Sequence, residues 1–258
     1  MDYLIVALTC MAASAMTFFS GFGLGTLILP VFAIFFTVDV AVALTAVVHF
    51  LNNLFKLFLV GKYVDKRIVL RFGFPAIGAA FLGAWLLVWL IDIPPLYEYE
   101  ISNHTFYVTP IKLTVAVLIF VFAIYDVMSE APSASFNQRY LPLGGLASGF
   151  FGGLSGHQGA LRSAFLVGCN LSTATFIGTS AVIACLVDVA RIAVYGSHYT
   201  AQGLNNSIAL VATAALAAFI GTFIGSRFIK AVSITRVRDL VGGLLLILAF
   251  ILGIGLIS

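Results

Sequence analysis

Hydrogen-bond donors gather in one glycine-rich stretch of this 258-residue chain, between residues 149 and 168. The residues that could do chemistry there are Ser155, Gly156, His157, Gln158, Gly159 and Arg162. A guanidinium group can make two parallel hydrogen bonds to a planar or tetrahedral oxyanion. Glycine lets the backbone turn and lets a ligand approach it closely. These residue types in this order predict a binding site for a small anion.

A second glycine cluster lies near the N-terminus and contains Gly21, Gly23, Gly25 and Thr26. We expect a helix to break in each cluster and a short helix to begin just after it, near Thr26 and near Gln158. The first N–H groups of such a helix have no partner inside the helix, and the helix dipole adds partial positive charge. Two such N-termini facing each other would bind an anion. Alternatively, the glycines have only a structural role and allow neighbouring helices to pack closely.

Polar residues also follow one face of two apolar segments. In the segment from 39 to 60 they recur at spacings of three and four and are Thr45, His49, Asn52, Asn53 and Lys56. In the segment from 171 to 195 they are Ser180, Asp188 and Arg191. Ionisable residues inside membrane spans are candidates for a substrate path or for coupling. Snorkelling of Lys56 to the membrane edge, and mutual neutralisation of Asp188 and Arg191, are the structural alternatives.

An intramembrane serine protease and an anion channel are alternatives to a transporter. Residues 153–156, Gly-Leu-Ser-Gly, have the Gly-x-Ser-Gly form seen in rhomboid proteases, with Ser155 as the nucleophile. That chemistry needs a histidine from another membrane helix. His157 is too near in sequence, His198 falls in a predicted loop, and His49 lies upstream. A channel would show acidic rings or a carbonyl filter, and neither is visible; we therefore expect a non-enzymatic carrier.

The composition places all these residues in a membrane protein. The chain is 62% hydrophobic and 9% charged, with a mean hydropathy of +1.13, whereas soluble domains carry roughly 25% charged residues. The long continuous apolar runs predict an all-α polytopic fold rather than an outer-membrane barrel. The basic residues form no patch with aromatics, which argues against nucleic-acid binding. The three cysteines lie in apolar sequence without metal spacing, so we expect no cofactor and no metal.

The apolar runs repeat in the two halves of the chain. The first half, 1–128, has a glycine-broken run over 3–36, spans over 39–60, 68–91 and 110–127, and a loop over 92–109. A polar linker covers 129–140. The second half, 141–258, has a glycine-broken run over 141–168 and spans over 171–195, 207–229 and 240–257. A shift of about 135 residues pairs Ser20 with Ser155, Asn53 with Asp188 and Lys56 with Arg191.

The basic residues set the expected orientation, because short loops rich in lysine and arginine stay in the cytoplasm. Two such clusters occur: Lys62, Lys66, Arg67 and Arg71; and Arg227, Lys230, Arg236 and Arg238. Counting spans from them places both termini and the loop over 92–109 outside. Each glycine-broken run then starts and ends on one side, as a re-entrant or paired short-helix segment followed by three spans. Equivalent elements face opposite ways, which predicts two inverted repeats with a site near the midplane.

The two glycine clusters resemble the signature of the sulfite exporter TauE/SafE family, also called the toluene sulfonate uptake permease family. Residues 21–30, Gly-Phe-Gly-Leu-Gly-Thr-Leu-Ile-Leu-Pro, fit its Gly-x-Gly-x-Gly pattern followed by proline. The second copy, residues 155–162, keeps two of the glycines and has no proline. The resemblance implies a membrane transporter of sulfite, sulfonates or related organic acids.

These observations together predict a secondary transporter of a small anion, with a sulfur-containing oxyanion or organosulfonate as the expected substrate. Alternating access would occur at the paired broken helices, in the lipid bilayer of a bacterial inner membrane. A homodimer and a coupling proton are compatible with the sequence but are not established by it. The candidate proton carriers are His49, His157 and Asp188.

Overall fold

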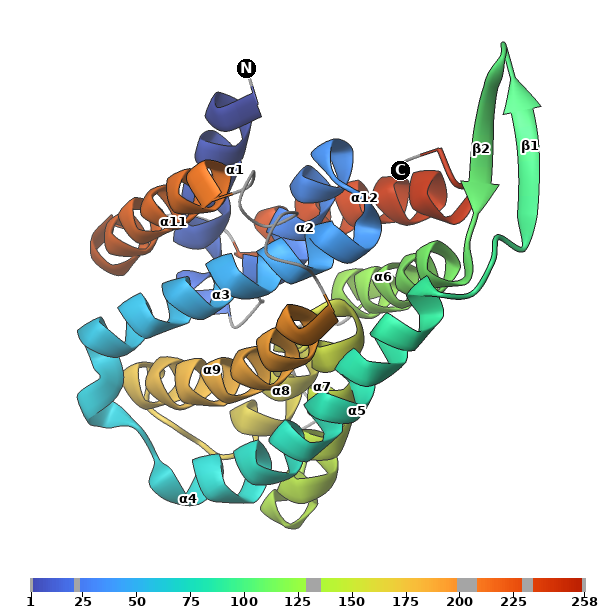
Figure 1. Ribbon diagram of the computed structural model, residues 1–258. Helices are drawn as coiled ribbons and strands as arrows, with labels where there is room; N and C mark the ends of the chain where they lie inside the picture. Colours follow the sequence, from blue (N-terminus) through green and yellow to red (C-terminus); the bar gives the residue numbers. More distant parts are fainter. Residues whose placement is uncertain (1, 21–23, 129–135, 199–207, 229–233, 257–258) are drawn as a thin grey trace.

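The computed structural model describes residues 2–20, 24–128, 136–198, 208–228 and 234–256, and nearly all of them are helical (Figure 1). Four helical segments are long and apolar enough to cross a membrane: Val38–Tyr63, Lys66–Ile91, Thr173–His198 and Ile208–Arg227. The prediction of a helical, polytopic membrane protein is therefore confirmed.

The first half begins with a broken helix pair, as its glycines predict. It comprises α1 (Asp2–Ser20), α2 (Leu24–Phe35), α3 (Val38–Val60), the 3-10 turn η1 (Gly61–Tyr63), α4 (Lys66–Ile68), the π-helical turn η2 (Val69–Gly73), α5 (Phe74–Ile91) and α6 (Pro110–Met128). Helix α6 starts at a proline, where the missing N–H costs no intrahelical bond.

The second half repeats this order. It comprises the 3-10 turn η3 (Gln138–Tyr140), α7 (Leu141–Ser155), α8 (Gly159–Val167), α9 (Thr173–His198), α11 (Ile208–Phe228) and α12 (Ile234–Gly253). Helix α9 continues three residues beyond the predicted end of its span at residue 195, through Gly196 to His198. The predicted start of the following loop at Gly196 is therefore wrong, whereas residues 199–207 lie outside the described part of the chain.

Helices of one half pack against helices of the other in matched pairs. Helix α5 lies along α7 and α1 lies along α11, while α3 contacts α9 and α6 contacts α12 (Figure 1). In chain order α1, α2, α3, α5 and α6 correspond to α7, α8, α9, α11 and α12. Exchanging the two halves leaves this set of pairs unchanged, as a two-fold relation between repeats requires. The inverted orientation of the repeats in the bilayer stays a prediction.

Glycine permits the closest of these helix contacts. Three glycines spaced four apart on α7 lie directly against backbone carbonyls of η2 and α5: Gly145 against Phe72 of η2, and Gly149 and Gly153 against Ala76 and Ala80 of α5. On α11, Gly221 and Gly225 lie in the same way against carbonyls of Met11 and Ala15 in α1. Small residues at such spacing let membrane helices pack backbone to backbone.

The connection over 92–109 is not the loop that we predicted but a β-hairpin. Strand β1 (Tyr97–Ile101) pairs antiparallel with β2 (His104–Val108). Ser102 and Asn103 both have positive φ, which is the conformation of a two-residue primed turn. Aromatic and apolar residues alternate with glutamates along β1, and the register pairs Tyr99 with Phe106, so their rings lie on one face and stack at 5.5 Å. The Tyr99 hydroxyl donates to the Ile254 carbonyl at 2.5 Å and ties the hairpin to the end of α12.

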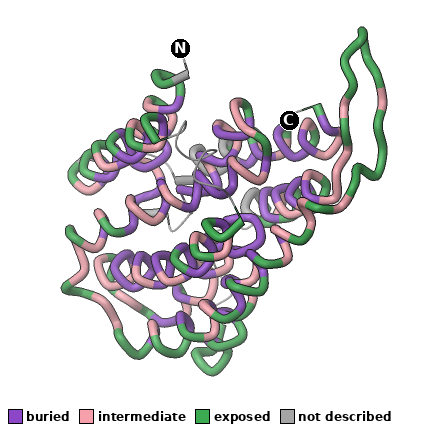
Figure 2. Tube along the Cα trace, in the orientation of Figure 1, coloured by how far each residue is buried: buried purple, intermediate pink, exposed green. Residues whose placement is uncertain are grey.

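Burial follows the helix interfaces. Figure 2 shows buried residues where helices face one another and exposed residues on the outward faces. Many of the exposed residues are large and apolar, for example Phe58 at 85% and Phe250 at 68%. In a bilayer such faces contact lipid, and the polar side chains are left for the interior.

Candidate functional site

The first turn of α2, which follows the first glycine cluster, meets the break between α7 and α8 in the interior of the molecule. Helix α7 ends at Gly156, whose φ of +81° is the left-handed conformation that glycine adopts at helix C-termini. A Cβ built on Gly25 would lie 3.7 Å from the Gly156 carbonyl oxygen and 3.7 Å from the His49 ring. The short helices begin at Leu24 and Gly159, within two residues of the predicted starts.

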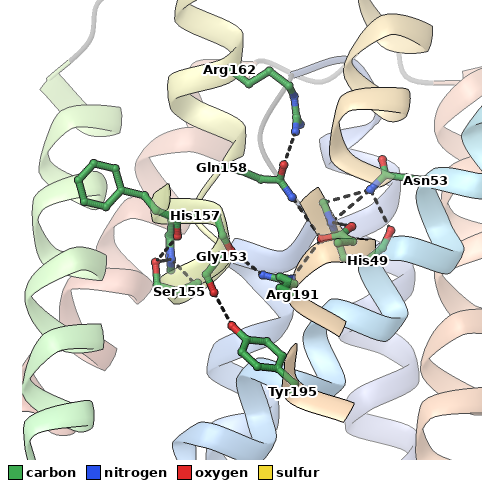
Figure 3. Close-up of polar contacts among 12 residues, drawn as sticks. His49, Asn53, Gly153, Ser155, His157, Gln158, Arg162, Arg191 and Tyr195 are labelled. Carbon is green, nitrogen blue, oxygen red and sulfur yellow. Dashed lines mark hydrogen bonds and ion pairs between the residues drawn. The ribbon is translucent and has the colours of Figure 1, made fainter. Parts of the chain in front are cut away.

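The start of α8 places Arg162 beside the break. The Arg162 N–H makes the first intrahelical bond, to the Gln158 carbonyl at 3.1 Å, so the N–H groups of residues 159–161 precede it without intrahelical acceptors. The Arg162 guanidinium turns back and donates from Nη1 to Gln158 Oε1 at 3.0 Å (Figure 3). The Ser148 hydroxyl donates to the Gln158 carbonyl at 3.0 Å, which fixes this turn against α7.

Asp188 on α9 is the residue with the most partners in the polar network, since His49, Gln158 and Arg191 all lie within contact distance of its carboxylate. Its Oδ2 lies 2.6 Å from His49 Nδ1 on α3, and its Oδ1 lies 3.2 Å from both Gln158 Nε2 and Arg191 Nε. An ionised carboxylate can only accept hydrogen bonds, so His49 Nδ1 carries the hydrogen and donates it. A continuous chain of hydrogen bonds thus runs from His49 through Asp188 and Gln158 to Arg162.

Helix α9 also holds the end of α7. Arg191 donates from Nη1 to the Gly152 carbonyl at 3.1 Å, and the Tyr195 hydroxyl donates to the Gly153 carbonyl. Both carbonyls belong to the last turn of α7, and the Gly152 oxygen accepts from the Gly156 N–H at 2.9 Å as well as from Arg191. A Cβ on Gly156 would lie 2.7 Å from Arg191 Nη1, so only glycine leaves room for this guanidinium.

Several buried polar atoms around the breaks have no hydrogen-bond partner among the described residues. They are Arg162 Nε, Arg191 Nε and Nη2, Asn52 Nδ2, His157 Nε2 and the hydroxyls of Thr17, Thr45 and Ser180. Arg191 Nε is close to Asp188 but lacks the alignment of a hydrogen bond. The arginine and amide nitrogens can only donate, so a ligand made of acceptors would complement them.

The buried charge in this region is positive. Among the described residues, the charged side chains that are buried are Lys56, Arg162, Arg191 and Asp188. The buried residues of this region thus include three cations and one carboxylate. Charges in an apolar interior are costly unless paired, so this excess favours an anionic partner.

The structure brings together most of the residues that the sequence singled out. Thr26, Ser155, His157, Gly159 and Ser180 are buried with the network residues, and Thr45 contacts Gly25. The Asn53 amide donates to the His49 carbonyl at 2.9 Å and lies 3.2 Å and 3.3 Å from the ring nitrogens. Asp188 and Arg191 do pair, but Asp188 is also shared with two further donors. Gly21 and Gly23 lie outside the described residues.

Asn52 belongs to a separate polar cluster, which the sequence analysis missed. Its Oδ1 accepts from Thr222 Oγ1 at 2.7 Å and from Ser14 Oγ at 3.1 Å, and it joins α3 to α11 and α1. The sequence analysis also did not single out Tyr195, whose hydroxyl binds the end of α7. Ser14 and Thr17 are hydroxyl residues three apart in the apolar α1, and that spacing is the signal that could have found this cluster.

Ser155 and His157 are neighbours, although the sequence argument had set this histidine aside. His157 Nδ1 lies 3.2 Å from Ser155 Oγ and 3.1 Å from the Ser155 carbonyl. Since a carbonyl only accepts, Nδ1 carries a hydrogen and is not free to take the serine proton. The Ser155 hydroxyl donates to the Phe151 carbonyl at 3.1 Å, and the histidine ring stacks on Phe122. The arrangement is that of packing and positioning, not of an activated nucleophile.

A family model described as sulfite exporter TauE/SafE matches residues 6–252. No curated protein matches the chain. The matched region contains both helix breaks and every residue of the polar network.

Proposed function

Because the chain belongs to the sulfite exporter TauE/SafE family, a family of membrane transporters of sulfite and related anions, we propose that it is a secondary transporter of a sulfur-containing oxyanion or organosulfonate. The observation that carries this proposal is the buried excess of positive charge with unpaired N–H donors at the meeting point of the two breaks. Sulfite and sulfonate groups present acceptor oxygens on several sides, which is what these donors lack. The proposal includes no catalytic step.

In the proposed binding mode, the anion lies between the N-terminal ends of α2 and α8. The free N–H groups at the start of α8 and the Arg162 guanidinium would hold its oxygens. Arg162 Nη1 is now engaged by the Gln158 side-chain oxygen. A bound anion would replace this oxygen, because an ionised acceptor makes the stronger hydrogen bond.

Alternating access would then follow from the arrangement of the halves. Each half supplies one break, and the hydrogen-bonded contact between α3 and α9 through His49 and Asp188 joins the halves next to the site. Rocking of one repeat against the other around this contact would expose the anion to each side in turn. The matched helix pairs support this proposal.

The proposed orientation puts both termini outside a bacterial inner membrane. Both chain ends and the hairpin lie toward the top of Figure 1, whereas α4, with Lys66 and Arg67, lies toward the bottom. Basic residues favour the cytoplasmic side. The chain ends and the hairpin thus lie away from the basic residues of α4, and this separation supports the proposed orientation.

Cysteine labelling in intact cells checks this orientation. We expect Lys62→Cys to react with a membrane-impermeant maleimide only after the cells are opened, and Glu98→Cys to react without opening. The native cysteines Cys10, Cys169 and Cys185 are buried and free, so they give little background. Labelling of both positions from the same side would contradict the orientation.

The function itself is tested with the purified full-length protein in liposomes. We expect labelled sulfite and labelled methanesulfonate to exchange across the membrane, and unlabelled substrate inside to accelerate uptake by counterflow. Acetate and chloride serve as comparison anions. Absence of exchange for both sulfur anions would refute the proposal, and flux without counterflow would favour the channel.

A further inference from the structure

We propose that His49 and Asp188 form a proton-binding site that is coupled to the anion site through Gln158, so that one proton moves with each anion. This inference rests on the proposed function and specifies its coupling ion. It is carried by the hydrogen-bond chain from His49 to Arg162 and by the full burial of its members.

The geometry defines where the proton binds. His49 Nδ1 donates to Asp188, so the second ring nitrogen, Nε2, keeps its lone pair. This atom lies 3.3 Å from the Asn53 amide nitrogen, and the Asn53 side chain can turn to offer its oxygen instead. A proton added at Nε2 would give an imidazolium next to the Asp188 carboxylate. The pair can therefore gain one positive charge while the hydrogen bond from His49 to Asp188 stays in place.

Gln158 connects this proton to the anion. Its amide nitrogen donates to Asp188 Oδ1, and this contact turns its side-chain oxygen toward Arg162. As long as Asp188 holds the amide nitrogen, Gln158 competes with an anion for the guanidinium. Protonation of the pair draws Asp188 toward the imidazolium and weakens its hold on Gln158. The Gln158 oxygen can then release Arg162, and the anion takes its place.

The surroundings favour histidine as the group that changes charge. The charged groups that interact with the His49 ring are Asp188 and Arg191 on α9 and Arg162 on α8. Arginine keeps its proton in proteins, so neither guanidinium is a carrier. Helices α2, α5 and α7 contain no titratable residue. The other titratable groups near the site are Lys56 of α3, His157, Cys185 and Tyr195. The remaining ones on the neighbouring helices are Asp39 of α3, His198 of α9, Asp2, Tyr3 and Cys10 of α1, Lys112, Tyr125 and Asp126 of α6, and Arg227 of α11.

Coupling of this kind is reciprocal. If the proton raises the affinity for the anion, the anion must raise the affinity for the proton by the same factor. Transport of a monoanion with one proton carries no net charge, so a pH gradient alone can drive it. We expect accumulation of about tenfold per unit of pH difference, toward the less acidic side.

The experiment compares exchange with pH-driven accumulation in the same liposomes. The probe is labelled methanesulfonate, which stays a monoanion across the working pH range, so its own titration does not contribute. We expect the wild type to exchange the probe at equal pH and to accumulate it when the outside is acidic, with protons entering alongside, as read by an entrapped pH dye. His49→Gln should lose proton entry and pH-driven accumulation, so that its uptake from an acidic outside no longer exceeds its own uptake at equal pH. His104→Gln, on the exposed hairpin, should keep both.

The outcomes separate the two proposals. If the wild type exchanges neither methanesulfonate nor sulfite, the proposed function fails, and the coupling fails with it. If it exchanges the probe but a pH gradient drives no accumulation, or if His49→Gln accumulates as the wild type does, only the coupling is overturned. Asp188→Asn is the second variant and should also lose pH drive. If neither variant folds, proton entry with the anion in the wild type decides the matter.

Discussion

Replacing Arg162 with alanine is expected to lower sulfite exchange at least about thirtyfold, because a buried charge-assisted contact of this kind costs roughly 2–5 kcal/mol when one partner is removed. Arg162 is 4% exposed, and its guanidinium faces Gln158 at the break between α7 and α8. The change removes both the charge and the fork of donors. It is measured as the initial rate of counterflow in liposomes at saturating and at low sulfite.

Two matched variants show whether this loss belongs to the site. Arg139→Ala removes an exposed arginine that contacts Tyr140, and its exchange rate should equal that of the wild type. Arg162→Lys keeps the charge without the bidentate geometry and should recover only part of the rate. Unchanged exchange in Arg162→Ala, with folded protein, would contradict the assignment of this residue to the anion.

Replacing Gly149 with valine is expected to destabilise the folded protein strongly. A Cβ at this position would collide with the Ala76 carbonyl oxygen and lie 2.6 Å from the Ala76 Cα, so the new side chain meets backbone that cannot turn away. Overpacking of this kind costs about 3 kcal/mol or more, which corresponds to a fall in the unfolding midpoint on the order of 10 °C. Thermal unfolding of the detergent-solubilised protein, followed by tryptophan fluorescence, measures the change.

The control for this variant lies on the facing helix. Gly78 of α5 has nothing within 4 Å of the place where a Cβ would stand. Gly78→Val carries the same change of side chain in the same helix pair, and its midpoint should stay within a few degrees of the wild type. Equal loss in both variants would show that helix propensity, rather than the α5–α7 contact, is responsible.

The positions of the helix breaks could be predicted because they depend on local chemistry. The glycine-rich stretch around Gly156 cannot continue as a stable lipid-facing helix, and Gln158 marks the start of the next helix in the sequence as well as in the structure. The polar face of α3 could also be predicted, because Thr45, His49 and Asn53 recur at helical spacing in an otherwise apolar segment.

The partners of these residues could not be predicted, because they come from distant parts of the chain. Asp188 and Arg191 are three apart, which predicts a local ion pair, but the sequence gives no sign that His49 and Gln158 share the same carboxylate. The hairpin was missed for a different reason. Its strands are only five residues long, and the prolines and acidic residues before and within β1 are typical of a loop.

The pairing of α1 with α11 and of α5 with α7 has a consequence for biogenesis. Helix α1 is inserted long before its partner α11 is synthesised. Until then, the surface of α1 at Met11 and Ala15, which packs against Gly221 and Gly225 in the folded protein, stays uncovered. Neither half contains a complete set of its own helix partners. The packing between the two halves can therefore be completed only after nearly the whole chain has been inserted. Fragments 1–128 and 141–258 should survive in cells when they are made together, and be degraded when either is made alone.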